Sequence, residues 1–268
     1  MSAAVNPRDT IRSVDAATLP VMLNSLRLPS INRLWQQIAE QADAEGWGTA
    51  RFLATLCEHE LAERHQRRIA RHLAQSGLPR GKSLTNFEFA AVKSLNKAKV
   101  MALAAADAWL EQGANVLIFG PSGTGKSHLA AAIGTNLVET GKRVLFTRTT
   151  DLVQKLQAAR RDLGLPQHLA KLDRFDLLIL DDFGYVRKDQ AETNVLFELI
   201  AERYERRSMI VTANQPFSEW HNIFPDEAMT VAAIDRLIHH ATIFELNTQS
   251  YRRRNAIAKN DKSTGHPN

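Results

Sequence analysis

Apolar residues recur every three to four positions in the first part of the chain, which predicts amphipathic helices. One such stretch covers residues 19–46 and is interrupted by Pro29, and a second covers 49–76 without Gly or Pro. Gly77 follows the second stretch as a stop signal. We therefore expect a small helical N-terminal domain over residues 1–82.

From residue 115 onward, short and continuous apolar runs alternate with helical patterns. Continuous runs are typical of strands buried on both faces. The expected strands are 115–119, 143–147, 175–182, 208–214 and 241–246, and the expected helices are 126–140, 150–162, 190–207 and 230–240. This alternation predicts an α/β domain over residues 83–251, built on a five-stranded parallel sheet with flanking helices. A polar, basic and flexible tail is expected over 252–268.

Composition excludes several classes of protein. Hydrophobic residues make up 44% and charged residues 24% of the 268 positions, which is ordinary for a globular protein and unlike a disordered chain. Cys57 is the single cysteine, so neither an internal disulfide nor a cysteine-based zinc site can form. No apolar run approaches the ~18–20 residues of a membrane span, and the N-terminus has no secretory pattern. We expect a soluble, cytoplasmic protein with no membrane partner.

The net charge of +5 is unevenly distributed. Residues 1–86 hold 11 basic and 8 acidic side chains (+3), residues 87–251 hold 18 and 20 (−2), and residues 252–268 hold 5 and 1 (+4). A near-neutral body with a basic segment on each side suggests a polyanionic partner, although many soluble proteins carry a similar charge.

Residues 120–127 match the phosphate-binding pattern G-x-x-x-x-G-K-[ST], between an expected strand and an expected helix. Glycines let the backbone curl around phosphates, and the helix N-terminus presents its donors to the anion. Lys126 is expected to reach the β- and γ-phosphates, and the Ser127 hydroxyl to ligate Mg²⁺. The expected nucleotide-binding residues are Gly120, Pro121, Ser122, Gly123, Thr124, Gly125, Lys126, Ser127 and His128.

A second acidic element follows about 55 residues later, where four apolar residues lead into Asp181 and Asp182. A buried strand that ends in an aspartate places a carboxylate at the sheet edge where nucleotides bind. Asp181 would hold Mg²⁺, and Asp182 would orient or deprotonate the attacking water. The acid pair favours water as the acceptor, and the chain lacks the N-K-x-D element of GTPases, so ATP hydrolysis is the expected reaction.

Two later residues are also candidates. Asn214 ends an expected strand before Pro216, where it is as well suited to forming a turn as to sensing a γ-phosphate. Arg236 lies on the last expected helix, and by itself it is more typical of a surface residue.

The chain resembles the AAA+ ATPases of the DnaC helicase-loader branch in the order of its motifs. These are the phosphate loop (Walker A), the strand that ends in two acids (Walker B), and then TANQPFSEW, IDRL and SYR. Within that branch the chain is similar to IstB-type helper ATPases of insertion-sequence transposition. The resemblance covers residues 20–253, including the helical stretches LRLPSINRLWQQIAEQ and ELAERHQRRIARHLAQSGLP.

The resemblance implies a role for each matching residue. Asn214 would be sensor 1, and Arg236 an arginine finger supplied to the ATP of a neighbouring subunit, so that active sites lie between the subunits of a homo-oligomer. The strand of Asn214 would lie between the Walker A and Walker B strands, and no C-terminal lid is expected. Arg252 is a weak candidate for sensor 2. Asp182 departs from the glutamate common in AAA+ enzymes, which fits a slow, switch-like ATPase.

The family also implies assembly with ATP on duplex DNA and recruitment or stimulation of the transposase encoded by the same element. A basic stripe at helical spacing could then contact DNA, or could simply be a solvated helix face. The candidate DNA-binding residues are Arg64, Arg67, Arg68 and Arg71 of this stripe, with Lys155, Arg160 and Arg161 on a later helix. The alternatives are a DnaC-like helicase loader and a metabolic P-loop enzyme.

Overall fold

The computed structural model describes residues 16–105, 108–184, 190–216, 219–220 and 226–248. Contacts divide the chain into two compact units, Met1–Arg68 and Ile69–Asn268. The division lies within helix α3 (Thr49–Gln75), so residues 69–82 belong to the larger unit instead of the helical domain expected over 1–82. Arg252 and the expected tail lie outside the described residues.

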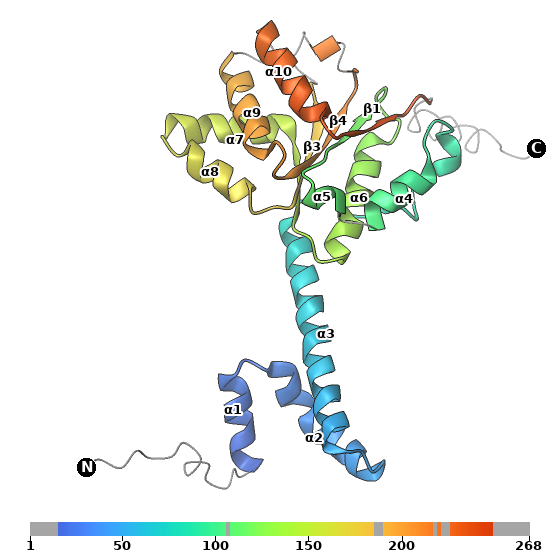
Figure 1. The fold of residues 1–268 in the computed structure, drawn as a ribbon, viewed down its shortest axis with the longest axis vertical. Helices are drawn as coiled ribbons and strands as arrows, with labels where there is room; N and C mark the ends of the chain where they lie inside the picture. The colour runs from blue at the N-terminus through green and yellow to red at the C-terminus, as the bar shows by residue number, and fades with distance from the viewer. Residues whose placement is uncertain (1–15, 106–107, 185–189, 217–218, 221–225, 249–268) are drawn as a thin grey trace, which may run out of the picture. The chain divides into compact units, whose positions relative to one another are not determined.

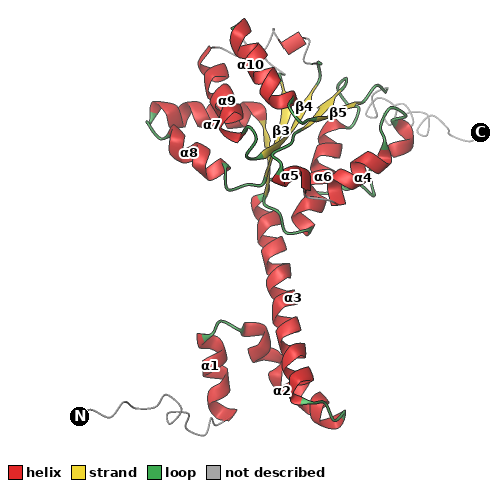
Figure 2. Cartoon of the chain, viewed as in Figure 1, coloured by secondary structure: helices red, strands yellow, loops and turns green. Residues whose placement is uncertain are grey.

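Helices and strands follow the predicted order closely (Figures 1 and 2). The N-terminal elements are a short 3₁₀ turn η2 (Ala16–Thr18), α1 (Leu19–Ser25), α2 (Pro29–Ala44) and α3. The larger unit adds η3 (Phe89–Ala91), α4 (Lys97–Ala105), α5 (Ala108–Glu111), β1 (Val116–Phe119), α6 (Lys126–Glu139), β2 (Val144–Arg148), α7 (Thr149–Arg161), α8 (Leu165–Leu172), β3 (Leu177–Phe183), α9 (Gln190–Arg203), β4 (Ser208–Ala213), α10 (Glu227–Ile238) and β5 (Thr242–Glu245). Helix α8 was not predicted, because its eight residues between Gly164 and Asp173 are too short for a clear periodicity.

The helical unit has a small core of its own. Pro29 does not interrupt a helix but begins α2, where its missing N–H costs no hydrogen bond. The core cluster consists, among the described residues, of Leu23, Ile31, Ile38 and Leu56. Six partly buried hydrophobic residues pack against this cluster, namely Leu19, Leu28, Leu34, Trp35, Trp47 and Phe52.

The five strands form one parallel sheet in the order β2-β3-β4-β1-β5. Alternate residues of each strand face opposite layers, as Val116 and Ile118 pack with α4, α5 and α6 while Leu117 and Phe119 pack with α7, α9 and α10. The two helical layers are visible on either side of the sheet in Figure 2. The α/β class and the flanking helices are confirmed.

The strand order sets the position of the candidate site. Strand β4 lies between β1 and β3, as the resemblance implied. The carboxyl ends of β1, β4 and β3 therefore share one edge of the sheet, where ligands bind in open α/β folds. Within the described part of the chain, no helix has the length and apolar character needed to cross a bilayer.

Candidate nucleotide site

The phosphate loop turns between β1 and α6 through three glycines in left-handed backbone conformations, Gly120 (φ 147°), Gly123 (φ 82°) and Gly125 (φ 103°). Space is limiting as well as conformation. A Cβ at Gly120 would lie 2.6 Å from the carbonyl oxygen of Leu246, and one at Gly125 would lie 3.2 Å from the ring of Phe87. These positions accept no side chain without displacement of the backbone or of Phe87.

Lys126 is the first residue of α6 and is only 5% exposed. Its ammonium donates to the carbonyl oxygens of Gly120 (2.7 Å) and Pro121 (2.9 Å), and to Oδ1 of Asn214 (2.7 Å). A buried ammonium requires such acceptors, because desolvation without them is costly. The contact brings two predicted site residues together, Lys126 from the start of α6 and Asn214 from the end of β4.

Asp181 is buried near the carboxyl end of β3, with 7% of its surface exposed. The hydroxyl of Thr212 on β4 donates to its Oδ1 at 2.6 Å, and the hydroxyl of Thr149 donates to its main-chain oxygen at 2.9 Å. Arg148 of β2 is the sheet partner of Asp181 on the other side. The predicted metal-binding carboxylate is thus held in one orientation by a strand neighbour.

The register between β3 and β4 shifts at Asp181 and Asp182. Leu180 pairs with Val211 and Phe183 pairs with Ala213, so the two aspartates stand opposite the single residue Thr212. The N–H of Asp182 donates to the Thr212 hydroxyl at 3.0 Å, and Asp182 takes a left-handed φ of 55°. One hydroxyl therefore serves both acidic residues, as donor to the first and as acceptor for the second.

Sequence reasoning missed Thr212. The available signal was a threonine near the end of the apolar run SMIVTAN, directly before the Ala-Asn pair. Its side chain is fully buried. A buried hydroxyl has to find hydrogen-bond partners, and at this edge of the sheet the partners are the two aspartates.

Trp220 is a second residue that was not singled out. It is 1% exposed, and its ring packs against Phe183 (4.6 Å between centroids) and Phe119 (6.1 Å). Its indole N–H donates to the main-chain oxygen of Gln215 at 3.2 Å. Trp220 thus ties the segment after Asn214 to the ends of β1 and β3.

The remaining loop residues have separate contacts. The Thr124 hydroxyl donates to the carbonyl oxygen of Pro121 at 2.9 Å and closes the loop on itself. His128 lies beside the segment before the loop, with Nε2 3.1 Å from the carbonyl oxygen of Ser83 and its ring edge-on to Phe87. Burial lowers the pKa of His128, so its imidazole is neutral at physiological pH. Among the described residues the Ser127 hydroxyl makes no hydrogen bond, which leaves it available as a ligand.

Known proteins are similar in sequence to this chain over most of its length. The family described as IstB-like ATP binding protein matches residues 21–259. A putative insertion sequence ATP-binding protein of Sinorhizobium fredii is 67% identical over 245 residues, covering 91% of this chain and 82% of the relative. The insertion sequence IS21 putative ATP-binding protein of Pseudomonas aeruginosa is 35% identical over 234 residues, covering 87% of this chain and 88% of the relative.

The chain belongs to the IstB-like ATP binding protein family.

Solved structures support the fold. AMPPCP-bound DnaA from Aquifex aeolicus superposes with a TM-score of 0.54 at 20% identity, over 71% of this chain and 57% of DnaA. DnaI superposes with a TM-score of 0.52 at 20% identity, over 64% of this chain and 95% of DnaI. Family and fold together confirm the predicted class, an AAA+ P-loop ATPase of the IstB-like family.

Arg236 is not brought to the phosphate loop within this IstB-like chain. Its guanidinium donates to the carbonyl oxygen of Ala232 on the same helix at 2.9 Å and lies over the ring of Phe197 on α9, 5.1 Å from the centroid. The side chain is half-buried against α9. Arg236 thus contacts α9 and its own helix, whereas Lys126 and Asn214 contact each other at the phosphate loop.

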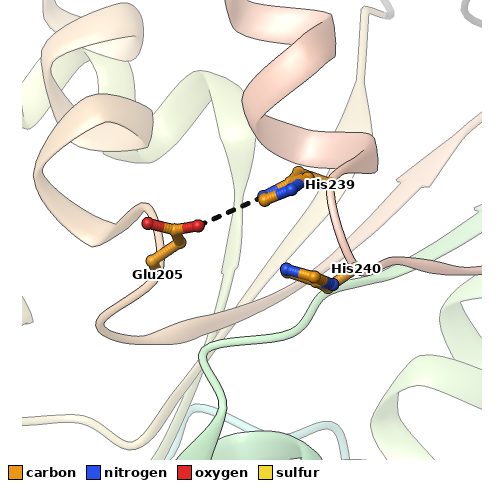
Figure 3. A group of neighbouring side chains, drawn as sticks. All are labelled: Glu205, His239 and His240. Carbon is orange, nitrogen blue, oxygen red and sulfur yellow. Dashed lines mark ion pairs between the residues drawn. The ribbon is translucent and has the colours of Figure 1, made fainter.

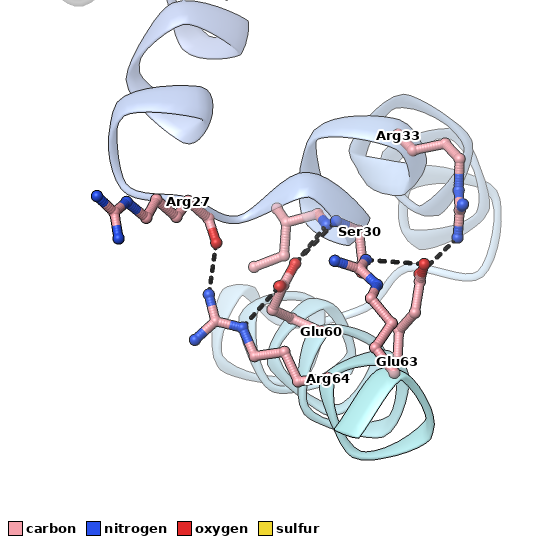
Figure 4. Close-up of polar contacts among 8 residues, drawn as sticks. Arg27, Ser30, Arg33, Glu60, Glu63 and Arg64 are labelled. Atoms are coloured by element: carbon pink, nitrogen blue, oxygen red, sulfur yellow. Dashed lines mark hydrogen bonds and ion pairs between the residues drawn. The ribbon is translucent and has the colours of Figure 1, made fainter. Parts of the chain in front are cut away.

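The arginines of the stripe on α3 differ in their contacts, and Figure 4 shows those of Arg64. Arg64 pairs with Glu60 at 2.8 Å and donates to the carbonyl oxygen of Arg27 at 2.5 Å. Arg67 pairs with Glu63 at 2.8 Å, and Arg33 joins the same carboxylate at 2.6 Å. Arg64 and Arg67 are thus already paired with carboxylates of their own helix. Arg68 contacts His65, and in the described part of the chain neither Arg68 nor Arg71 has a carboxylate partner.

The second basic group lies on α7. Arg160 pairs with Glu198 of α9 at 3.0 Å, with both side chains largely exposed. Lys155 and Arg161 are exposed and form no ion pair with any described residue. Four of the seven cations predicted to contact DNA thus remain unneutralised within the described structure, namely Arg68, Arg71, Lys155 and Arg161.

Proposed function

We propose that this protein binds ATP with Mg²⁺ at the carboxyl edge of the sheet, assembles with it on duplex DNA, and recruits or stimulates the transposase encoded by the same insertion sequence. The observation that carries the nucleotide part is the 2.7 Å contact between Lys126 and Asn214. It joins the phosphate loop to the end of the neighbouring strand, beside the strand that holds Asp181. The names of the relatives support the insertion-sequence part.

The residues at this edge fit a magnesium ion. Mg²⁺ prefers oxygen ligands and keeps several waters. The Ser127 hydroxyl and the Asp181 carboxylate would hold it, and Thr212 engages only Oδ1 of that carboxylate. When bound, Mg²⁺ neutralises charge on the phosphate oxygens.

The protein's own groups divide the remaining work. Lys126 would exchange its carbonyl partners for phosphate oxygens, since charged acceptors bind an ammonium more strongly than neutral ones. The backbone N–H groups of the loop and of the first turn of α6 would bind the β-phosphate. Asp182 would accept a proton from the attacking water or orient it, with Asn214 aligning the same water.

Arg236 would complete the site of a neighbouring subunit. Within the chain its guanidinium contacts Phe197 of α9 and the carbonyl oxygen of Ala232 on its own helix. A guanidinium that reaches the γ-phosphate in trans is worth ~10³–10⁵ in rate. ATP hydrolysis would then depend on oligomer formation, and oligomers would reset when ADP replaces ATP.

DNA contacts are assigned chiefly to the unneutralised cations. An arginine already paired with a carboxylate offers less net charge to a phosphate, so Arg68, Arg71, Lys155 and Arg161 should contribute more than Arg64, Arg67 and Arg160. Contacts to the phosphate backbone carry little sequence information, and affinity should fall steeply with salt.

The assembly proposal is tested by measuring the mass of the protein with duplex DNA and ATP, and again with ADP, by light scattering after size exclusion. We expect a large ATP-dependent rise in mass. A mass that is the same with ATP, with ADP and without nucleotide would overturn the assembly model.

The in-trans role of Arg236 needs a separate measurement. Arg236→Ala should bind ATP normally and lose about 10³-fold or more in turnover on DNA. Arg174→Ala, which removes an exposed arginine at the turn before β3, is the matched control and should hydrolyse ATP like the wild type. Normal hydrolysis by Arg236→Ala would refute the arginine finger.

The partner is tested by adding the transposase encoded by the same element to protein assembled on DNA with ATP. Retention of the transposase and faster strand transfer support the proposal. Loading of a replicative helicase without any effect on the transposase would favour the helicase-loader alternative instead.

A further inference from the structure

Three metal-ligating side chains meet at the amino edge of the sheet, opposite the edge that carries the phosphate loop (Figure 3). Glu205 lies in the turn between α9 and β4, and His239 and His240 lie in the turn between α10 and β5. Because all strands are parallel, the turns that precede β4 and β5 share this edge. All three side chains are exposed to solvent.

The donor atoms are spaced as ligands of one ion would be. One atom from each residue lies within 4.8 Å of the other two. Nδ1 of His239 is 3.3 Å from Oε1 of Glu205. Two ligands about 2.0–2.2 Å from a tetrahedral zinc ion stand roughly 3.3–3.5 Å apart. The Glu205–His239 pair already has that separation, and a rotation of the His240 ring, whose centroid is 3.9 Å from that of His239, would bring in the third donor.

The backbone holds both turns in place. Glu205 (φ 55°) and His240 (φ 58°) adopt left-handed conformations that side-chain-bearing residues rarely take. Both turns pack on residues 113–115. A Cβ at Gly113 would lie 2.7 Å from the carbonyl carbon of Glu205, and Asn115 donates to the carbonyl oxygen of Leu237 at 3.1 Å. The backbone that carries the three donors is therefore held by packing that does not depend on a bound ion.

A tyrosine completes the group. The Tyr204 hydroxyl lies 2.9 Å from Nδ1 of His239. A metal ion on Nδ1 would take the lone pair that faces this hydroxyl, and the hydroxyl would then hydrogen-bond to a metal-bound water, as outer-shell partners of metal ligands do.

We propose that Glu205, His239 and His240 bind one divalent transition-metal ion of the zinc class, with water completing its coordination. Two imidazoles and a carboxylate suit zinc, copper or nickel, whereas Mg²⁺ prefers oxygen donors alone. The site is distinct from the expected Mg²⁺ site in both its ligands and its edge of the sheet. A bound ion would fasten the end of α10, the helix that carries Arg236, to the turn after α9.

The test is a titration of the full-length, nucleotide-free protein with ZnCl₂ in competition with a chromophoric chelator. We expect one zinc ion per chain with a Kd of about 1 μM or tighter near neutral pH. Omitting nucleotide keeps this result independent of the proposed ATPase function. Binding weaker than about 100 μM, or a stoichiometry well below one, would overturn the proposal.

Variants localise the ion. His240→Gly removes a ligand at a position whose backbone suits glycine, and His239→Ala removes the second imidazole. Each should weaken zinc binding about tenfold or more, whereas His168→Ala, at an exposed histidine on α8, should bind zinc like the wild type. Far-UV circular dichroism checks that the variants fold. Equal affinity in folded His239→Ala and His240→Gly would place the zinc elsewhere and refute the site.

A spectroscopic readout separates coordination from loose surface binding. Co²⁺ in place of zinc should show the strong visible absorption of a four-coordinate site with nitrogen ligands, and His239→Ala should abolish it. The weak spectrum of hexaaqua cobalt in the wild type would contradict the proposal.

Discussion

The carboxyl edge of the sheet and the helical unit both use charged side chains, but in opposite environments. At the sheet edge, Lys126 and Asp181 are 5% and 7% exposed and are bound by specific neighbours. In the helical unit, the side chains of Arg64 and Arg67 are 48% and 49% exposed, and their carboxylate partners lie one turn away on the same helix. A charge in water interacts weakly with its partner, whereas a buried charge depends on it.

Glu60 is the exception that sharpens this contrast. It is 3% exposed, and its Oε2 accepts the backbone N–H groups of Ser30 (2.8 Å) and Ile31 (3.2 Å) at the start of α2 (Figure 4). These N–H groups have no partner within their own helix. Whether a charged side chain contributes to folding stability therefore depends on its burial and not on its residue type.

The largest effect is expected at the sheet edge. Lys126→Ala removes a buried ammonium that would bind the phosphates, and ATP affinity should fall about 100-fold or more, since two charge-assisted hydrogen bonds are worth ~3 kcal/mol or more. Titration with a fluorescent ATP analogue measures this. Lys171→Ala on the exposed face of α8 is the control and should bind like the wild type. Similar ATP affinities for Lys126→Ala and Lys171→Ala would show that Lys126 does not bind the phosphates.

The next effect concerns Thr212. Thr212→Val keeps the shape but leaves Oδ1 of Asp181 and the N–H of Asp182 without the hydroxyl, and kcat should fall about 10–100-fold. Thr212→Ser restores the hydroxyl and should recover most of the rate, which a role in packing alone would not produce. Steady-state hydrolysis over a range of Mg²⁺ concentrations measures both, and the valine variant should also require more Mg²⁺. An unchanged Mg²⁺ requirement would argue against Thr212 as a positioning residue.

A smaller effect should separate two glutamates of the helical unit. Glu60→Ala leaves two N–H groups of α2 and the guanidinium of Arg64 without their acceptor, and should destabilise the fold by about 2–3 kcal/mol. Glu63→Ala loses exposed ion pairs and the hydrogen bond from Ser30, but leaves no backbone N–H of α2 without an acceptor, and should change stability less. Urea unfolding monitored by circular dichroism compares the two. Equal losses would show that burial does not distinguish these contacts.

The smallest effect appears on acidification. Hydrogen bonds from Ser30 and Arg67 lower the pKa of Glu63 to about 2, and the pKa of Glu60 is also lowered, because the hydrogen bonds from Arg64 and α2 outweigh its burial. A depressed folded-state pKa adds stability above the unfolded value of 4.5 that is lost as pH falls toward 2. Thermal unfolding should therefore shift downward below about pH 4.5 in the wild type. Glu63→Gln should shift less, and an identical shift would contradict the assignment.

The strand and helix pattern allowed most of the fold to be predicted. Continuous apolar runs located the five strands, and the phosphate loop was located by glycines whose conformations only that residue adopts freely. Arg203 could not be placed in this way. In the sequence it is one of several cations near the end of a helix, which favours a surface position. In the structure it is 1% exposed and donates to the carbonyl oxygens of Leu172 (3.0 Å) and Ser208 (3.0 Å).

The sequence by itself determined the elements, the phosphate loop and the acidic strand end, because each depends on residues close together in the chain. Only the tertiary structure decided which side chains meet. Thr212 and Asp181 lie 31 positions apart, and Lys126 and Asn214 lie 88 apart, and they became neighbours through the order β3-β4-β1. His239 and His240 likewise lie near Glu205 because the turns before β5 and β4 share the amino edge of the sheet. Contacts across strands depend on sheet order and register, and neither is encoded in local periodicity.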